Sequence, residues 1–367
     1  MSRTRDQGPR TEDRGLGTGD RGPRTKDQGL ESRTSTTTVA PTHQLLSSLI
    51  ALLVVSCTAL QCNFADGAEA TNQATVILVV GASGQPEFET NFVRQVELWT
   101  ALCARQAKAI RIGLGEPSNV TDHERLRQIL AAEVGQTNQP LWLVFIGHGT
   151  FDGKEARFNL RGPDVSASEV RDWLKPLRQP LVFINTASAS APFLNQLSAT
   201  NRVIITATRS GSEQNFTRFG LYLAEAMTDS QSDLDQDGQT SILEAFLSAS
   251  ARAAEFYKTE GRLATEHALI DDNGDGLGTP ADWYRGVRPV KKPERSALVD
   301  GARAHQVHLV LGKAEQDLPA EVRAKRDAIE LSIAQLRDTR SQYSEDDYYH
   351  KLEKLLIELI EVYGDRL

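Results

Sequence analysis

The chain has 367 residues, with 41 Lys or Arg against 49 Asp or Glu, and therefore a formal net charge of −8. A chain of this length can bury one large core or two smaller ones. The acidic balance, with no offsetting stripe of Lys and Arg, argues against nucleic acid as the main partner and leaves metal ions as partners for the acidic residues.

The first 34 residues form a degenerate seven-residue repeat, visible in DQGPRTE, DRGLGTG, DRGPRTK and DQGLESR. Gly and Pro recur inside each unit and the apolar seam of a coiled coil is absent, so the pattern predicts disorder at 1–34. The alternative is a repetitive tract translated from upstream of the true start. The only Met after Met1 is Met227, so a later start would need another codon.

An apolar run in HQLLSSLIALLVVSCTALQC, too short for a comfortable membrane span, precedes an Ala-x-Ala cleavage pattern that ends at Ala70. We expect a signal peptide at 41–70, a secreted or periplasmic protein, and no membrane span after cleavage. The alternative is a lipoprotein attached through Cys57, for which VVSC is a poor match. Cleavage would remove Cys57 and Cys62 and leave Cys103 without an intrachain disulfide partner.

From residue 71 the sequence alternates between apolar strands and amphipathic helices. Strands are predicted in ATVILVVGA, KAIRIG, PLWLVFIGHG, PLVFINTA and RVIITATRS. Thr121, with Glu124 three residues later, has the spacing of a helix capping box. Nearly uninterrupted Val, Ile and Leu strands separated by helices predict an α/β domain at 71–229, with a mostly parallel sheet covered by helices on both faces.

Two predicted strands end in polar residues. The third strand ends in FIGHGTFDG and the fourth in FINTASAS, so His148 and residues 185–190 should emerge at one edge of the sheet, where ligands of such sheets bind. In these residues the chain resembles the caspase/legumain/gingipain clan of cysteine peptidases, in particular its bacterial caspase-like and legumain-like members. There, a strand ending in His-Gly supplies the catalytic His, and the next strand ends at the nucleophilic Cys.

The resemblance assigns roles to the matching residues. It implies that His148 would protonate the leaving amine and that the Gly149 N–H would help to hold the oxyanion. The second motif departs from the clan, because Ala187 stands at the cysteine position. The resemblance therefore implies a catalytically impaired peptidase homologue, which we expect to act as a binding or scaffold module for a peptide or protein ligand.

Two other interpretations of these residues stay open. In a hydrolase, Ser188 would be the nucleophile and His148 its base, with Asp152 as the only nearby acid that could orient the imidazole, because a serine hydroxyl is not ionised at neutral pH. In a purely structural interpretation, His148 bonds a loop carbonyl and Gly149 only makes a turn. Cys103 falls within the first helix, where we expect a buried, small apolar side chain.

The segment DLDQDGQTSILE has the spacing of a twelve-residue EF-hand calcium loop, with Gly238 at position 6. The predicted Ca²⁺ ligands are Asp233, Asp235, Asp237, the carbonyl of Gln239, Ser241 through water, and Glu244 through both carboxylate oxygens. Helical patterns flank the loop on both sides. The alternative is an Asp-rich capping turn without an ion.

A second segment, DDNGDGLGTPAD, follows the pattern more loosely. The corresponding ligands are Asp271, Asn273, Asp275 and, at position 12, Asp282. Asp at that last position is shorter than Glu, and an Asx/Gly turn is the alternative. Outside the cytoplasm such loops act as static clamps, because ambient calcium keeps weak sites filled. A protein whose function is structural calcium binding is therefore a further alternative.

The remaining sequence predicts accessory parts. Residues 230–288 would form a helical extension that carries the calcium loops, and RPVKKPERS begins a linker at 289–317. Residues 318–367 predict two amphipathic helices with Ser344 as the N-cap of the second. Such an antiparallel hairpin would pack on the core domain or mediate self-association.

Overall fold

The computed structural model describes the chain from residue 73 to residue 363, with gaps at 117–118, 136–138 and 297. The predicted repeat, the signal peptide, Cys57 and Cys62 lie outside the described residues. None of the helices within the described part is long and apolar enough to cross a membrane.

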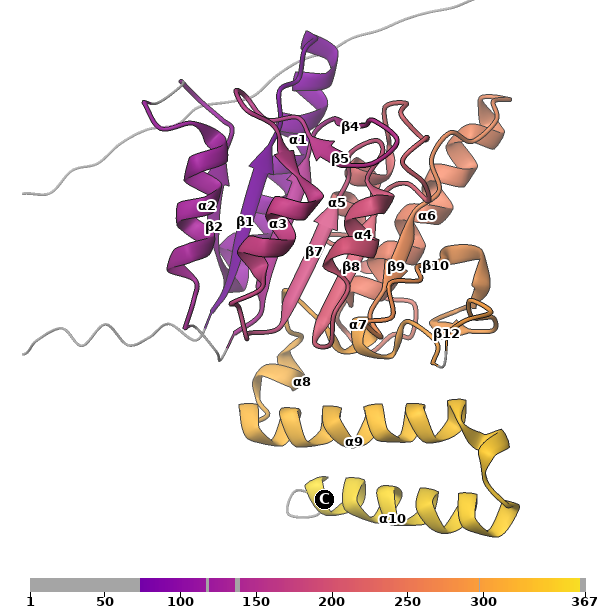
Figure 1. Ribbon diagram of the computed structural model, residues 1–367. Helices are drawn as coiled ribbons and strands as arrows, with labels where there is room; N and C mark the ends of the chain where they lie inside the picture. The colour runs from indigo at the N-terminus through magenta and orange to yellow at the C-terminus, as the bar shows by residue number, and fades with distance from the viewer. Residues whose placement is uncertain (1–72, 117–118, 136–138, 297, 364–367) are drawn as a thin grey trace, which may run out of the picture. The chain divides into compact units, whose positions relative to one another are not determined.

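A seven-stranded sheet organises the fold, with the strand order β10-β9-β8-β7-β3-β1-β2 (Figure 1). Its parallel strands are β1 (Ala74–Val80), β2 (Ala107–Ile112), β3 (Leu141–Ile146), β7 (Leu181–Asn185) and β8 (Arg202–Thr206). Two short strands, β9 (Leu269–Asp271) and β10 (Thr279–Pro280), continue the sheet in antiparallel fashion. The predicted α/β class with a mostly parallel sheet is confirmed.

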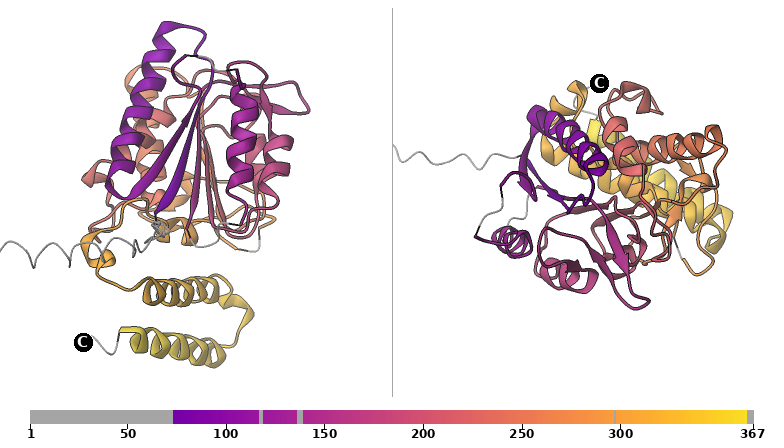
Figure 2. Two further views of the ribbon diagram at one scale, coloured as in Figure 1. Left: turned by 90° about the vertical axis from the view of Figure 1, so that its left-hand side faces the viewer. Right: turned by 90° about the horizontal axis from the view of Figure 1, so that it is seen from above.

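Helices cover both faces of the sheet (Figure 2). The first face carries α1 (Pro86–Gln106), α5 (Phe219–Ala226) and α6 (Ile242–Thr259). The second carries α2 (Asp122–Ala132), α3 (Ala167–Leu174) and α4 (Ala191–Leu197). Alternate residues of each strand enter the apolar cluster of one face or the other, which explains why the central strands are apolar throughout.

Three very short strands follow His148 directly and were not predicted. They are β4 (Gly149–Phe151), β5 (Ala156–Phe158) and β6 (Val165–Ser166), and they form a separate antiparallel sheet. A further small ribbon pairs β11 (Tyr284–Arg285) with β12 (Arg288–Pro289). Strands of two or three residues are too short to show a period of hydrophobicity.

The segment 230–288 contributes to the main core. Its helix α6 enters the first apolar cluster, and β9 and β10 extend the sheet. Short 3-10 turns, η1 (Ser230–Ser232) and η2 (Ala281–Trp283), flank these elements. We therefore describe 230–288 as part of the α/β domain, where the sequence had suggested an extension.

The linker and the C-terminal helices also contain regular structure. The linker holds α7 (Ala302–Gln306) and α8 (Lys313–Gln316), and it buries Ala304 and Leu309 in the first apolar cluster. Beyond it, α9 (Ala320–Asp338), η3 (Arg340–Gln342) and α10 (Glu345–Tyr363) give the expected helix pair. The hydroxyl of Ser344 accepts the N–H of Asp347 at 3.1 Å, as an N-cap does.

Candidate functional site

The strands β3 and β7 are neighbours and end at the same edge of the sheet, with Phe145 opposite Asn185. The turns that follow them touch. The Gly149 N–H donates to the Ser188 hydroxyl oxygen at 3.2 Å, and that hydroxyl donates to the Gly149 carbonyl at 3.0 Å. The prediction that these two strand ends meet is confirmed.

His148 lies in a ring of aromatic side chains. Its imidazole centroid is 4.7 Å from Phe88, 5.3 Å from Phe92 and 6.1 Å from Phe216. The Nε2 atom lies 3.3 Å from the backbone carbonyl oxygen of Ser83. Burial among these rings lowers the pKa of His148 below its ordinary value, so the neutral imidazole is favoured at pH 7.

Ala187 follows the neighbouring strand, β7. It is fully buried in the cluster of the second sheet face, together with Phe145, Phe183 and Phe193. Phe92, which contacts the imidazole, belongs to the cluster of the first face. Ala187 and Phe92, one of the rings around His148, therefore belong to different apolar clusters, although Ala187 is also a close neighbour of Gly149.

The structure does not assemble Ser188, His148 and Asp152 into a triad. Ser188 is 3% exposed, and its hydroxyl both accepts the Gly149 N–H and donates to the Gly149 carbonyl. The Asp152 carboxylate accepts the N–H groups of Lys154 and Glu155, each at 2.9 Å. The Gly149 N–H, expected to hold an oxyanion, is likewise engaged, because a buried backbone donor needs a partner.

Close backbone approach explains the small residues at this edge. A Cβ atom on Gly149 would lie 2.3 Å from the Ser188 carbonyl oxygen, so only glycine fits there. Ala189 has a φ of 53°, a left-handed conformation that is unfavourable for alanine. Its N–H donates to the carbonyl of Glu213 at 2.7 Å, which joins this turn to the loop after β8.

That loop also reaches a second histidine, which the sequence did not single out. The Glu213 carboxylate lies 2.6 Å from Nδ1 of His267, while Phe216 of the same loop packs against His148. The neighbouring Glu266 is buried and accepts the N–H of Phe219 at 3.0 Å, which closes the start of α5. These partners are far apart in sequence, and no local pattern marks them.

A cavity of about 660 Å³ lies beside these residues. Its wall is rich in apolar and small side chains of α6 and of the loop before β9, and Glu266 and His267 also line it. Because β9 runs antiparallel to β8, with Leu269 opposite Thr206, the loop before β9 lies at the sheet edge where β8 ends. The cavity is therefore close to the edge where ligands of α/β sheets bind.

The first predicted calcium loop gathers three of its ligands. Single oxygen atoms of Asp233, Asp235 and Asp237 lie within 4.8 Å of one another. Calcium binds oxygen at about 2.4 Å, so ligands on opposite sides of one ion are about 5 Å apart, and the three carboxylates fit. Gly238 has a φ of 91°, the conformation that the sharp turn at position 6 requires.

The other predicted ligands of this loop have backbone or linker partners. Ser241 and Glu244 form the capping box of α6, and the Glu244 carboxylate also accepts the N–H of Leu234 at 2.7 Å. The side-chain oxygen of Gln239 accepts the N–H of Gly312 at 3.0 Å. The structure thus brings together the first three acidic ligands, and it places Ser241 and Glu244 in the helix cap.

The second loop forms the turn between β9 and β10. Asp271 is buried, and its carboxylate accepts the N–H groups of Gly274 and Gly276 at 2.9 Å each. The oxygen of Asn273 accepts the N–H of Asp275 at 2.9 Å, and Asp282 lies beyond β10. In the described part of the chain, only Asp233, Asp235 and Asp237 form a metal-sized group of acidic, His or Cys side chains.

Cys103 is buried in the first apolar cluster, as expected. Burial raises the pKa of its thiol to about 11, so the thiol stays protonated at neutral pH. A nucleophilic or metal-binding role would require the thiolate.

No protein-family model and no curated protein matches the chain. Among solved structures, the Drosophila initiator caspase Dronc has 14% identity and a TM-score of 0.38, over 56% of this chain and 81% of that one. Caspase-1 of Spodoptera frugiperda has 9% identity and a TM-score of 0.38, over 55% and 87%. The protein GSU0716 of Geobacter sulfurreducens has 7% identity and a TM-score of 0.36, over 54% of this chain and 92% of that one. These are partial likenesses of fold at low identity.

Proposed function

We propose that this chain is a catalytically impaired homologue of the caspase/legumain/gingipain clan, secreted or periplasmic, that binds a peptide or protein ligand without cleaving it. The observation that carries the proposal is the pair of hydrogen bonds between Ser188 and Gly149. They engage the hydroxyl of Ser188, which follows the cysteine position, and the N–H expected to hold an oxyanion.

Cleavage by the clan's route needs a nucleophile, a base and an oxyanion donor. At this sheet edge Ala187 offers a methyl group, and His148 contacts the Ser83 carbonyl and three Phe rings. For Ser188 to attack, both of its hydrogen bonds would have to break, which leaves buried groups unpaired at about 1–3 kcal/mol each. In the structure this hydroxyl bonds the Gly149 backbone, and Nε2 of His148 contacts the Ser83 carbonyl.

The sheet edge where the parallel strands end has a cavity suited to a peptide ligand. The cavity of about 660 Å³ offers apolar surface beside Glu266 and His267, which suits an apolar side chain of a peptide. We assign ligand binding to this region because it combines a cavity with the strand ends at which α/β sheets bind ligands.

We also propose that Ca²⁺ binds the loop 233–244 and stabilises it. Asp233, Asp235 and Asp237 would hold the ion, whose charge would offset the repulsion among the three carboxylates. We do not extend this proposal to the second loop, because its acidic side chains do not form a metal-sized group in the described part of the chain.

Activity-based labelling of the purified chain tests the proposal. A fluorophosphonate probe and a thiol-reactive probe should both leave the native protein unlabelled, because Ser188 and Cys103 are buried and not ionised. After unfolding, the thiol probe should label Cys103, which shows that the reagent is active. Fluorophosphonate labelling of the native chain that disappears in Ser188→Ala would overturn the proposal and favour the hydrolase.

A further inference from the structure

Residues 305–312, which we call the strap, run along the predicted calcium loop. At one end, Nε2 of His305 lies 2.9 Å from Oδ2 of Asp235. At the other end, the Gly312 N–H donates to the side-chain oxygen of Gln239 at 3.0 Å. The strap is thus bonded to two residues of the loop.

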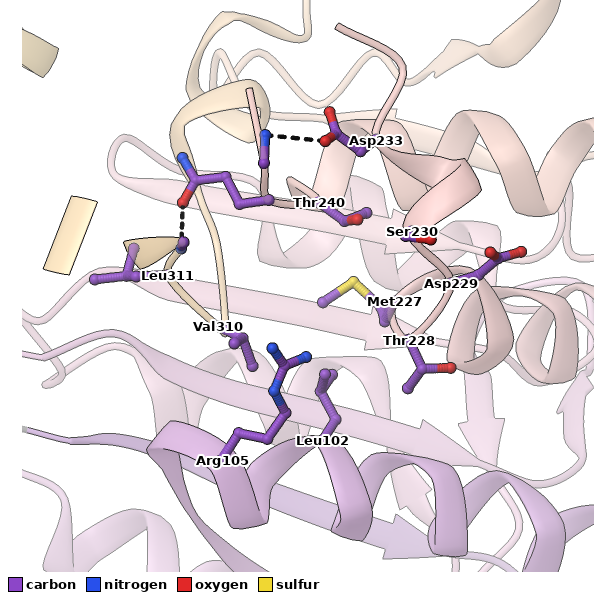
Figure 3. Close-up of a pocket in the computed structure, with 13 residues that line it drawn as sticks. Leu102, Arg105, Met227, Thr228, Asp229, Ser230, Asp233, Thr240, Val310 and Leu311 are labelled. Carbon is purple, nitrogen blue, oxygen red and sulfur yellow. Dashed lines mark hydrogen bonds between the residues drawn. The ribbon is translucent and has the colours of Figure 1, made fainter. Parts of the chain in front are cut away.

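Backbone contacts add to these bonds. The carbonyl of Val307 accepts the N–H of Ile242, the first residue of α6, at 2.9 Å. A Cβ atom on Gly312 would lie 3.1 Å from the carbonyl oxygen of Gly238, so the two backbones pack closely. A cavity of about 230 Å³ lies between α1 and the end of the strap, and Leu311 and Asp233 are among its lining residues (Figure 3).

One attachment of the strap does not involve the loop. The backbone N–H of Leu311 donates to the side chain of Gln106 in α1 at 2.9 Å, and that side chain donates to the Leu311 carbonyl at 2.9 Å. The adjacent amides of Leu311 and Gly312 therefore report on different neighbours. The first reports on α1, and the second on the calcium loop.

The strap also contacts the C-terminal helices. Gln306, next to His305, donates from Nε2 to the backbone carbonyl of Asp327 in α9 at 2.9 Å. The same nitrogen lies 3.3 Å from the carboxylate of Glu330. Two consecutive residues of the strap therefore bond the calcium loop and the helix α9.

We propose that calcium in the loop 233–244 fastens the strap, and through it α9, to the α/β domain. This inference rests on the calcium site of the proposed function. Three carboxylates within 4.8 Å repel one another, so without a cation the loop loses the arrangement that meets the strap. A bound ion removes that repulsion and holds Asp235 and Gln239 where His305 and Gly312 contact them.

His305 is then a positioning residue for the metal. Its hydrogen bond fixes Oδ2 of Asp235, so the ion would be held by Oδ1, which also accepts the N–H of Asp237 at 3.3 Å. Because coupling between two binding events is reciprocal, a strap that calcium stabilises must itself strengthen calcium binding by the same factor. Loss of such an outer partner lowers metal affinity by about tenfold or more.

Hydrogen exchange of the full chain, with calcium and with a calcium chelator, tests the coupling without any substitution. We expect the Gly312 amide to exchange at least about fivefold faster without calcium, within the usual range of coupling between sites. The Leu311 amide should change much less, because its partner Gln106 lies in α1.

Calorimetry of His305→Ala completes the test. Calcium affinity should fall by about tenfold, whereas His350→Ala in α10, whose imidazole lies 2.9 Å from the Asp346 carbonyl of its own helix, should leave it unchanged. Equal affinity in His305→Ala together with unchanged Gly312 exchange would refute the coupling and leave the calcium site standing. Absence of any calcium binding by the unsubstituted chain would instead refute the calcium site itself.

Discussion

The Ser188 hydroxyl and the Gly149 backbone form a reciprocal pair of hydrogen bonds, one in each direction, in the buried interface between two turns. This pair joins the end of β7 to the start of β4. Ser188 thus has a structural role in this turn. A close backbone approach at Gly149 makes the pair possible, because any larger residue would meet the Ser188 carbonyl.

Ser188→Ala should therefore reduce stability. It leaves a buried N–H and a buried C=O of Gly149 without that partner, and we expect a loss of about 1–3 kcal/mol in the free energy of unfolding. Urea denaturation measures this loss. Ser212→Ala, an exposed serine, should stay within about 0.5 kcal/mol of the parent. Equal stability of both variants would show that the pair contributes nothing.

Ala189 and Ala187 offer a matched test of backbone strain. Both are buried, but only Ala189 has a positive φ, of 53°. Glycine at either position loses a methyl group and gains freedom in the unfolded chain, while Ala189→Gly also relieves about 1–2 kcal/mol of left-handed strain. Urea denaturation should find Ala189→Gly more stable than Ala187→Gly by about that amount. The reverse order would contradict the strained conformation.

Much of the fold was predictable because its signals are local. The apolar strands, the N-cap of α2 at Thr121 and that of α10 at Ser344 each appear within a few residues of sequence. The alternation of strands and helices then favours a mostly parallel sheet with helices on both faces. The strands β4, β5 and β6 were missed, because two or three residues carry no periodic signal.

The site was less predictable because it depends on distant partners. The resemblance placed His148 and Ala187 at adjacent strand ends, and they are, but it could not tell that Phe88, Phe92 and Phe216 surround the imidazole. Likewise, the contact of Asp235 with His305 joins residues 70 positions apart. The spacing of the predicted calcium loop, by contrast, correctly grouped Asp233, Asp235 and Asp237, whereas Glu244, predicted with them, caps α6.

Calcium should raise the melting temperature through the first loop. With calcium at 100 times its dissociation constant, binding adds about 2.7 kcal/mol to the stability, which shifts the melting temperature by several degrees. Asp237→Asn should remove most of this shift. The matched variant Asp275→Asn, at the same position of the second loop, should keep it. A shift lost equally in both variants, or absent in the parent, would contradict the assignment to the first loop.

His148 should make stability depend on pH. Its pKa is lowered in the folded chain by burial, whereas in the unfolded chain it is about 6.5. Between these two values the unfolded chain binds the proton and the folded chain does not, so stability falls as the pH drops below about 6.5, until the folded pKa is reached. The variant His148→Phe has no titrating group at this position. Its apolar side chain is compatible with the surrounding side chains of Phe88, Phe92 and Phe216.

The comparison of the two proteins isolates this contribution, because all other titrating groups are shared. Urea denaturation at pH 7.5 and at pH 5 should show the free energy of unfolding of His148→Phe rising relative to the parent as the pH is lowered. An NMR titration of the folded chain should give a pKa below 6.5 for the His148 imidazole. A stability difference that is the same at both pH values would mean that His148 titrates alike in the folded and unfolded chains, and the enclosing aromatic ring would then be wrong.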